Sequence, residues 1–321
     1  MDGNDLDRAR TARAAATRAA ARSGVRVRAL ASLAETLACE RLLAEVWRTG
    51  ADHPPLAADV IQALADAENY VAGAFEAVAP GDRLLGACVG FWGPPGRPRM
   101  HSHIAGVHDA VRGRDVGFAL KLDQRAAGLE HGITEITWTF DPLVARNAHF
   151  NLRKLGGSAD TYLVDHYGQM VDGLNGTDPT DRLVLRWDLA GERTHRACDE
   201  ALPPEPGAPD IGAPERRLPR SGSFEPGAPE RRLPRSGSPV PPPALLAADG
   251  DRPRHRPVDA ERVLVAVPRD IETLRRRNPT AAREWRLAVR EVLVPLLAGG
   301  ARLVDFDRAA SGYVVALGEP R

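Results

Sequence analysis

The sequence of 321 residues is long enough for one large domain or two small ones, and its 43% of apolar residues is ordinary for a globular protein. A formal net charge of zero gives no whole-chain argument for a nucleic-acid partner or an anionic membrane, and we expect neither. Three widely spaced cysteines form no C-x-x-C pair, so neither a disulfide framework nor a zinc knuckle is indicated. No secretory pattern or membrane-length apolar run is present, which favours a cytoplasmic protein.

The N-terminal 24 residues are rich in alanine and arginine, and we expect a flexible, loosely attached tail at 1–24. Arginine is abundant throughout, whereas lysine occurs only at Lys121 and Lys154, so arginine runs count for little as functional evidence.

Regular patterns begin at residue 25 and continue to residue 190. Alternation predicts a strand at 25–30, and two helices follow at 32–49 and 56–67. Alternating segments, broken by the turn sequences APGD and GPPG, then predict three strands at 69–78, 83–92 and 97–108. The remaining elements are a helix at 116–130, a strand at 133–140, a short helix at 147–156 and strands at 158–168 and 181–189. This order predicts an α/β domain with a mixed, mostly antiparallel sheet flanked by helices.

The composition changes after residue 190. Residues 191–259 are rich in Pro, Arg, Gly and Ser and contain GAPERRLPRSGS twice, so we expect a disordered linker. Strand and helix patterns resume in residues 260–321, which predicts a small αβ subdomain. Because this piece is small, we expect it to pack against the first domain, and it also offers a contact for a homodimer.

The stretch VRGRDVGFALKLDQR, residues 111–125, places a glycine-spaced basic loop before a helix. Free amides of a first helical turn and the helix dipole favour an anion, and glycines let a phosphate approach the backbone. The fitting ligand is a diphosphate. The spacing matches neither the P-loop nor the dinucleotide-binding pattern.

This stretch resembles the acetyl-CoA signature R/Q-x-x-G-x-G/A of the GNAT acyltransferase superfamily, at Arg112-Gly113-Arg114-Asp115-Val116-Gly117. A second motif, NAHFNLRKLGG, is similar to the family's N-x-x-A-x-x-x-Y-x-K-x-G-F region at Asn147, Lys154 and Gly156. The resemblance covers about 25–190, including the element order, and the phrases WTFDPL and FNLRKLG look most like a poorly characterised bacterial branch of the family.

The resemblance implies a GNAT-like fold in which the strands 99–108 and 133–140 splay apart around acetyl-CoA or another acyl-CoA. Pantetheine would pair with the first strand near Val107, and the diphosphate would sit on the loop. The implied cofactor-binding residues are Val107, Arg112, Gly113, Arg114, Val116, Gly117 and Asn147, with no metal. The implied reaction is direct transfer of the acyl group to an amine.

The chain departs from the family pattern at two positions. Asp115 stands where glycine is usual, and we expect its carboxylate to cap the following helix. Leu152 stands at the position of the tyrosine that is the usual thiolate acid. Tyr167, Tyr162 or solvent would have to protonate the thiolate instead.

Candidates for the general base are His103 first, then His101, which share one face of the strand, and then Glu76. Near the expected acceptor end, Trp138, Asp141 and Asn151 are candidates for substrate binding, although we favour core packing for Trp138 and a turn role before Pro142 for Asp141. The sequence therefore predicts an N-acyltransferase for a small-molecule amine. The alternatives are a non-catalytic acyl-CoA-binding or regulatory module, and an acyltransferase that uses a carrier-protein thioester or a protein amine.

Overall fold

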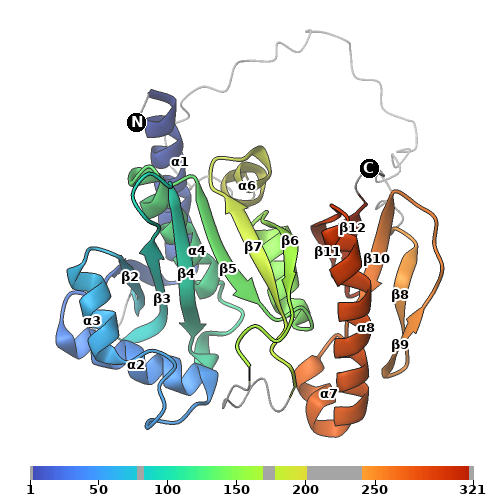
Figure 1. Cartoon of the computed structure of the whole chain (residues 1–321). Helices are drawn as coiled ribbons and strands as arrows, with labels where there is room; N and C mark the ends of the chain where they lie inside the picture. The colour runs from blue at the N-terminus through green and yellow to red at the C-terminus, as the bar shows by residue number, and fades with distance from the viewer. Residues whose placement is uncertain (1–2, 78–82, 169–177, 201–240, 318–321) are drawn as a thin grey trace, which may run out of the picture.

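The computed structural model describes residues 3–77, 83–168, 178–200 and 241–317. Its strands form a continuous sheet in the order β1-β2-β3-β4-β5-β7-β6-β11-β12-β10-β8-β9 (Figure 1). The chain thus has the mixed α/β fold that the sequence predicts.

The first seven strands follow the predicted order closely. They are β1 (Val25–Ala29), β2 (Tyr70–Glu76), β3 (Leu84–Trp92), β4 (Arg99–Val107), β5 (Glu135–Phe140), β6 (Ser158–Leu163) and β7 (Arg182–Asp188). Neighbouring strands pair antiparallel, except that β4 and β5 are parallel. The alternating apolar positions and the turns between strands were therefore sufficient to locate these elements.

Helices cover both faces of this part of the sheet. They are α2 (Leu33–Trp47), α3 (Ala58–Asp66), α4 (Val116–Glu130), α5 (Ala145–Ala148) and the π-helical turn η2 (His149–Lys154). Helices α2 and α3 pack over a core that includes Leu43, Ile61 and Phe75, whereas α4 packs over a larger core that includes Met100 and Ile136. Short helical turns also occur at Asp109–Val111, before α4, and at α6 (Glu192–His195) and η3 (Arg196–Glu200).

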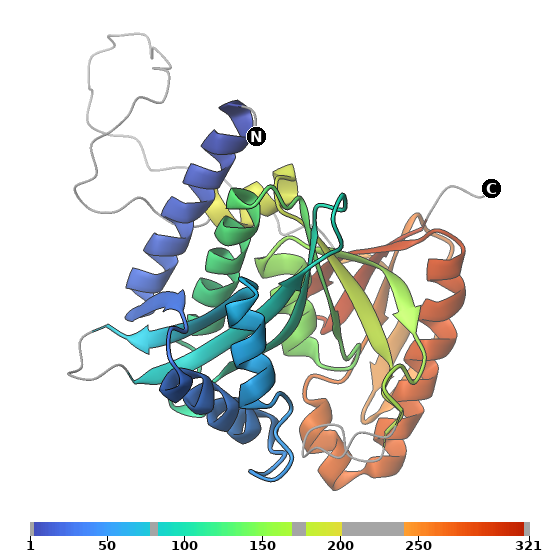
Figure 2. The ribbon, with the colours of Figure 1, turned by 60° about the vertical axis from the view of Figure 1, so that its left-hand side comes forward.

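The N-terminal residues do not form the loose tail expected at 1–24. Residues Gly3–Arg22 form helix α1, which lies beside α4 (Figure 2). Ala9, Ala12, Ala16 and Ala19 are buried on one side of it, and Arg13 forms ion pairs with Asp123 and Glu130 of α4. Small side chains at spacings of three and four residues let the two helices approach closely. Because alanine is only weakly apolar, this buried stripe could not be recognised from the composition of residues 1–24.

The expected linker at 191–259 is too long at both ends. Residues 192–200 are helical, and β8 (Ala244–Asp249) and β9 (Arg252–His255) form a hairpin that pairs with β10 (Arg262–Ala266). The predicted disorder and the tandem duplication fall mainly on residues 201–240, which lie outside the described residues.

The C-terminal segment extends the sheet of the first domain. It contains α7 (Ile271–Arg277), α8 (Pro279–Ala298), β11 (Arg302–Asp307) and β12 (Gly312–Ala316). Strand β11 pairs with β6 at Leu303–Ala159, and α8 packs on β6, β8 and β9. Among the described helices, none is long and apolar enough to cross a membrane.

Candidate active site

The site opens where two parallel strands separate. Strands β4 and β5 pair only from Arg99–Glu135 to His101–Thr137. Beyond this point lies a cavity of about 600 Å³, called here the central cleft. Its walls come from β4, α4, β5, α5 and η2, with further residues from α2, β7 and α7. The splayed strands expected from the GNAT resemblance are therefore present.

A β-bulge lies at the start of this opening. Ser102 pairs with Gly90 and Ile104 pairs with Val89, so His103 is the extra residue of β4. A bulge bends its strand and locally disrupts the ladder. It therefore turns β4 away from β5 at the point where the cleft begins.

Most of the predicted cofactor-binding residues line the central cleft. These are Val107, Arg112, Gly113, Gly117 and Asn147. Gly113 has φ +83°, a conformation that favours glycine, and its Cα faces open space. Val116 is buried as the first residue of α4, so it can offer only its backbone amide.

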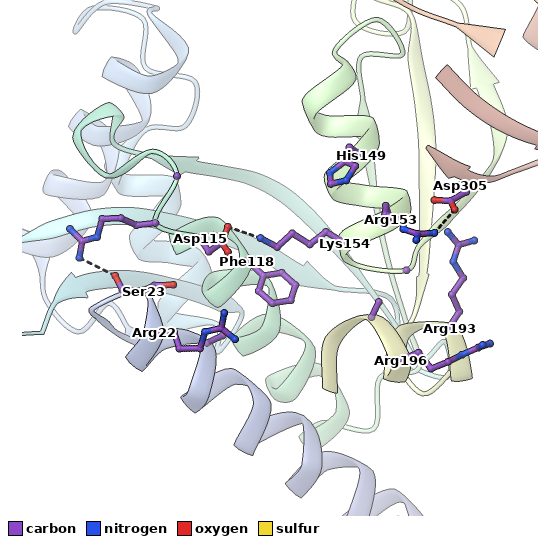
Figure 3. A pocket seen from close by; sticks show the side chains of 15 residues that line it. Arg22, Ser23, Asp115, Phe118, His149, Arg153, Lys154, Arg193, Arg196 and Asp305 are labelled. Carbon is purple, nitrogen blue, oxygen red and sulfur yellow. Dashed lines mark hydrogen bonds and ion pairs between the residues drawn. The ribbon is translucent and has the colours of Figure 1, made fainter. Parts of the chain in front are cut away.

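A second cavity, called here the basic pocket, has a volume of about 870 Å³ and shares Gly113 with the central cleft. Six arginine and lysine side chains and His149 line it, and the acidic ones are Asp115 and Asp305 (Figure 3). The basic residues are Arg22, Arg114, Arg153, Lys154, Arg193 and Arg196. Two ion pairs lie within it, Lys154–Asp115 at 2.5 Å and Arg153–Asp305 at 2.7 Å. The excess of positive charge suits an anionic ligand.

The carboxylate of Asp115 does not cap α4, contrary to the expectation from sequence. Asp115 occupies the N-cap position with φ +61°, but its side chain makes no capping hydrogen bond and pairs with Lys154 instead. Arg114, which is predicted to bind the cofactor, donates from its guanidinium to the carbonyl of Ser23 at 2.9 Å. It lines the basic pocket rather than the central cleft.

The two strand histidines lie close together, as their spacing predicts. Their ring centroids are 6.3 Å apart, and both lie beside Phe91. His103 lines the central cleft, whereas His101 does not. Burial lowers the pKa of His103, which keeps its imidazole neutral and able to accept a proton near pH 7. Glu76 lies at the end of β2 and lines neither cavity.

The candidate thiolate acids occupy different positions. Leu152, which stands where the GNAT pattern has its tyrosine, is fully buried and carries no ionisable group. The hydroxyl of Tyr162 donates to Asp181 at 2.6 Å, and burial raises the pKa of Tyr162. Tyr167 is about half exposed and is hydrogen-bonded to Thr139, a residue of the cleft wall, at 2.9 Å. Tyr167 thus lies at the rim and not within the cleft.

The residues predicted to bind substrate all line the central cleft, but Asp141 cannot have the predicted role. Both of its oxygens accept hydrogen bonds from Arg286 at 2.8 Å, and one also accepts from Arg275 at 2.9 Å. These arginines hold the pKa of Asp141 well below its usual range despite its burial. The carboxylate is committed to α7 and α8 and is not available to an amine. Trp138 and Asn151 are buried in the cleft wall.

Sequence reasoning missed two contributions to the cleft. The first is α7, whose Glu272 and Arg275 line the cleft wall; Glu272 also pairs with Arg146 at 2.5 Å. The second is Lys121 of α4, which is buried at the same wall. A lysine in an amphipathic helix usually lies on the solvent face, so the pattern gave no signal for its burial. Within the described residues, no three His, Cys, Asp or Glu side chains are grouped to hold a metal.

The sequence matches no protein-family model and no curated protein. Similar solved structures include the ribosomal-protein-S18-alanine N-acetyltransferase from Escherichia coli, with 10% identity and a TM-score of 0.40 over 52% of this chain and 97% of that chain. A GCN5-related N-acetyltransferase from Kribbella flavida has 20% identity and a TM-score of 0.37 over 51% and 98% of the two chains. The NatC complex bound to Gag peptide and CoA has 17% identity and a TM-score of 0.40 over 51% and 98%.

Because the overall TM-scores are low, the fold is best recognised from this chain's own geometry. The order of elements along the chain from β1 to β7 and the parting of β4 from β5 are the features that the sequence resemblance predicts. The part of the chain from β1 to β7 is thus a mixed, mostly antiparallel α/β unit with the arrangement expected from the GNAT resemblance.

Proposed function

We propose that this protein transfers an acyl group, acetyl being the simplest case, from acyl-CoA directly to the amine of a small molecule. The observation that carries the proposal is the central cleft, which runs from the glycine loop before α4 to the point where β4 leaves β5. This path suits an extended donor with a diphosphate at one end and a thioester at the other.

The glycine loop and the basic pocket fit the anionic part of CoA. Amides at the first turn of α4 would receive the diphosphate, and the absence of a side chain at Gly113 and Gly117 would allow close approach. The 3′-phosphate and adenosine would extend into the adjoining basic pocket. The ion pair with Lys154 offsets the unfavourable charge of Asp115 beside the diphosphate.

In the transfer step, the amine nitrogen attacks the thioester carbon and the C–S bond breaks. His103 would take the proton from the attacking amine, since it lies at the cleft with a pKa that burial lowers. Backbone amides of β4 beyond the end of the β5 ladder would stabilise the oxyanion.

Donor binding is tested by calorimetric titration with CoA. A Cβ added at Gly117 would lie 3.6 Å from Cγ2 of Val107, and both residues line the central cleft. The indole of Gly117→Trp should therefore fill the space that the diphosphate needs and abolish CoA binding. Val60→Trp, at an exposed position of α3, is the matched control and should bind like the unmodified protein. Equal CoA affinity in all three proteins would contradict the proposed donor site.

The base is tested through the pH dependence of CoA release with an amine panel. Turnover should rise with pH at the acid end, because imidazole must be neutral to accept a proton. His103→Gln should lower turnover by roughly 10²-fold and leave CoA binding intact. If both His103→Gln and His101→Gln kept full turnover and the same acid limb, a histidine base would be wrong.

The burial of Leu152 where the family has its acid favours one alternative, a module that binds acyl-CoA without transferring the acyl group. CoA binding with no amine-stimulated thiol release from acetyl-CoA would support this alternative against the enzyme.

A further inference from the structure

The ammonium of Lys121 lies inside the protein, where the cleft begins. The residue is 6% exposed and lines the central cleft. It is one of only two lysines in the chain. Burial of a charged amine is costly unless the amine is paired, so its retention at this place calls for an explanation.

Three neutral groups hold Lys121. Its Nζ donates to the hydroxyl of Ser102 at 2.7 Å and to Oε1 of Gln124 at 3.0 Å. It also lies 3.7 Å from the ring centroid of Trp138 on β5. Within the described chain, Lys121 forms no ion pair with a carboxylate. The amine is thus fixed in one orientation by groups that do not lock it in the charged state.

Ser102 connects this amine to the path of the donor. It lines the cleft and is the first residue of β4 after the last pair with β5. From Val107, where the pantetheine arm would start, five residues of strand lead to Ser102, at most about 17 Å at ~3.4 Å per residue because the bulge at His103 shortens the path. This length is comparable with an extended pantetheine arm, which would bring the thioester sulfur near Ser102.

We propose that Lys121 supplies, through the hydroxyl of Ser102, the proton that the CoA thiolate takes up as it leaves. This inference rests on the proposed acyl transfer. It identifies a proton donor for the thiolate, a role that Leu152 cannot have because its side chain has no acidic proton. It also places acid and base on different side chains of neighbouring β4 residues, Ser102 and His103.

The proton balance is complete without another reactant. The amine nitrogen forms a bond to the acyl carbon, and the C–S bond breaks to give a thiolate. Ser102 gives its hydroxyl proton to sulfur and receives one from the Lys121 ammonium. His103 holds the proton that the amine loses, and solvent restores both residues to their starting states.

Electrostatics support this role. Burial lowers the pKa of Lys121 to about 8, so the amine is charged at neutral pH but gives up its proton readily. The titratable groups that face it from packed strands are Cys88 on β3, which raises the pKa, and His101 on β4, whose own pKa Lys121 lowers. Its nearest partners on α4 and β5, Gln124 and Trp138, do not titrate.

The test compares the pH profile of amine-dependent CoA release in the full chain and in Lys121→Met, whose unbranched side chain fills the same space without a proton to give. In the unmodified protein, turnover should fall above about pH 8 as Lys121 loses its proton. Lys121→Met should be slower by roughly 10²-fold, should lack this alkaline limb, and should bind CoA with unchanged affinity.

The other lysine provides a matched control. Lys154→Met removes a charge from the basic pocket, so it should weaken CoA binding and raise the KM for acetyl-CoA while the alkaline limb stays. Ser102→Ala should lower turnover by at least tenfold, and full activity in this variant would overturn the relay. Full turnover with an unchanged limb in Lys121→Met would overturn the inference. An acyl group on Ser102, found by mass spectrometry, would also overturn it, since Ser102 would then be a nucleophile.

Failure of the Lys121 proposal can be distinguished from failure of the proposed acyl transfer. Amine-dependent CoA release by the unmodified protein supports acyl transfer whatever Lys121 does. Its complete absence, with CoA bound, would reject transfer itself.

Discussion

Gly156 shows how a single residue fixes the wall of the basic pocket. It follows η2, which ends at Lys154, and has φ +74°; an added Cβ would lie 2.8 Å from the carbonyl oxygen of Arg193. The backbone of α6 can therefore approach η2 only because this position has no side chain. Arg193 and Lys154, which line the pocket, are held in place by this close contact.

Gly156→Ala should destabilise the protein by two effects, an unfavourable positive φ and a clash with backbone. Gly300→Ala is the matched control, because Gly300 has φ +93° but open space around its Cα. We expect Gly300→Ala to cost about 1 kcal/mol and Gly156→Ala about 1–3 kcal/mol more. Urea denaturation of the two variants measures the difference. Equal losses would mean that α6 moves aside freely.

The sequence could indicate which residues lie at the cleft where local pattern places them, but not where a partner is distant in sequence. The glycine loop and His103 lie at the cleft because a strand, loop and helix in succession place them there. Asp141 accepts from the amide of Leu143 as a turn residue would, but its ionic partners could not be predicted because both arginines follow more than 130 residues later. No local pattern reports such a pairing. Lys121 was missed for the related reason that its burial depends on β4 and β5.

At the level of elements, a buried ionic cluster attaches α7 and α8 to the first domain. Asp141 binds Arg286 and Arg275, and Asp181 binds Arg290 at 2.7 Å and 2.9 Å. The hydroxyl of Tyr313 on β12 donates to the carbonyl of Pro142 at 2.7 Å. These contacts are satisfied hydrogen bonds in a buried interface, so losing one partner leaves a costly unpaired group.

Arg286→Met should destabilise the protein by about 3–5 kcal/mol, because the buried carboxylate of Asp141 loses its bidentate partner. Adding Asp141→Asn removes the unpaired charge and should recover part of the loss. Because the pKa of Asp141 is lowered in the folded state, the stabilisation is present at neutral pH and is lost progressively as the pH falls from about 4, the unfolded value, towards the depressed folded value. Denaturation curves at pH 7 and about pH 2 test both points. A loss that is the same at both pH values, or no recovery in the double variant, would contradict this account.

The sequence predicted whether a segment is a helix or a strand better than it predicted which elements pack or pair with one another. Strands β1 to β7 and helix α4 follow from alternation, amphipathic spacing and turn residues. Helix α1 was underestimated because its buried stripe consists of alanine, which carries little apolar signal. Strands β8 and β9 were assigned to the linker because their sequence is short and borders a proline-rich run.

For the whole molecule, continuity of the sheet means that the two parts of the chain should stay together without a covalent connection. We predict that a specific protease site introduced at residue 220, when cut, leaves fragments 1–220 and 221–321 eluting as one species. The reason is the shared pairing of β6 with β11 and the buried ionic cluster. Gel filtration after cleavage measures this. Separation of the fragments at micromolar concentration would show that the interface is too weak to hold.

The C-terminal segment also completes a wall of the central cleft through Glu272 and Arg275 of α7. Any molecule that touches these residues and the first domain at once acts as a non-covalent crosslink between them. By mass action, such a molecule must tighten the association of the cut fragments by the same factor by which association tightens its own binding. The binding free energy of a cleft ligand that contacts α7 is therefore thermodynamically coupled to the association of the two parts of this chain.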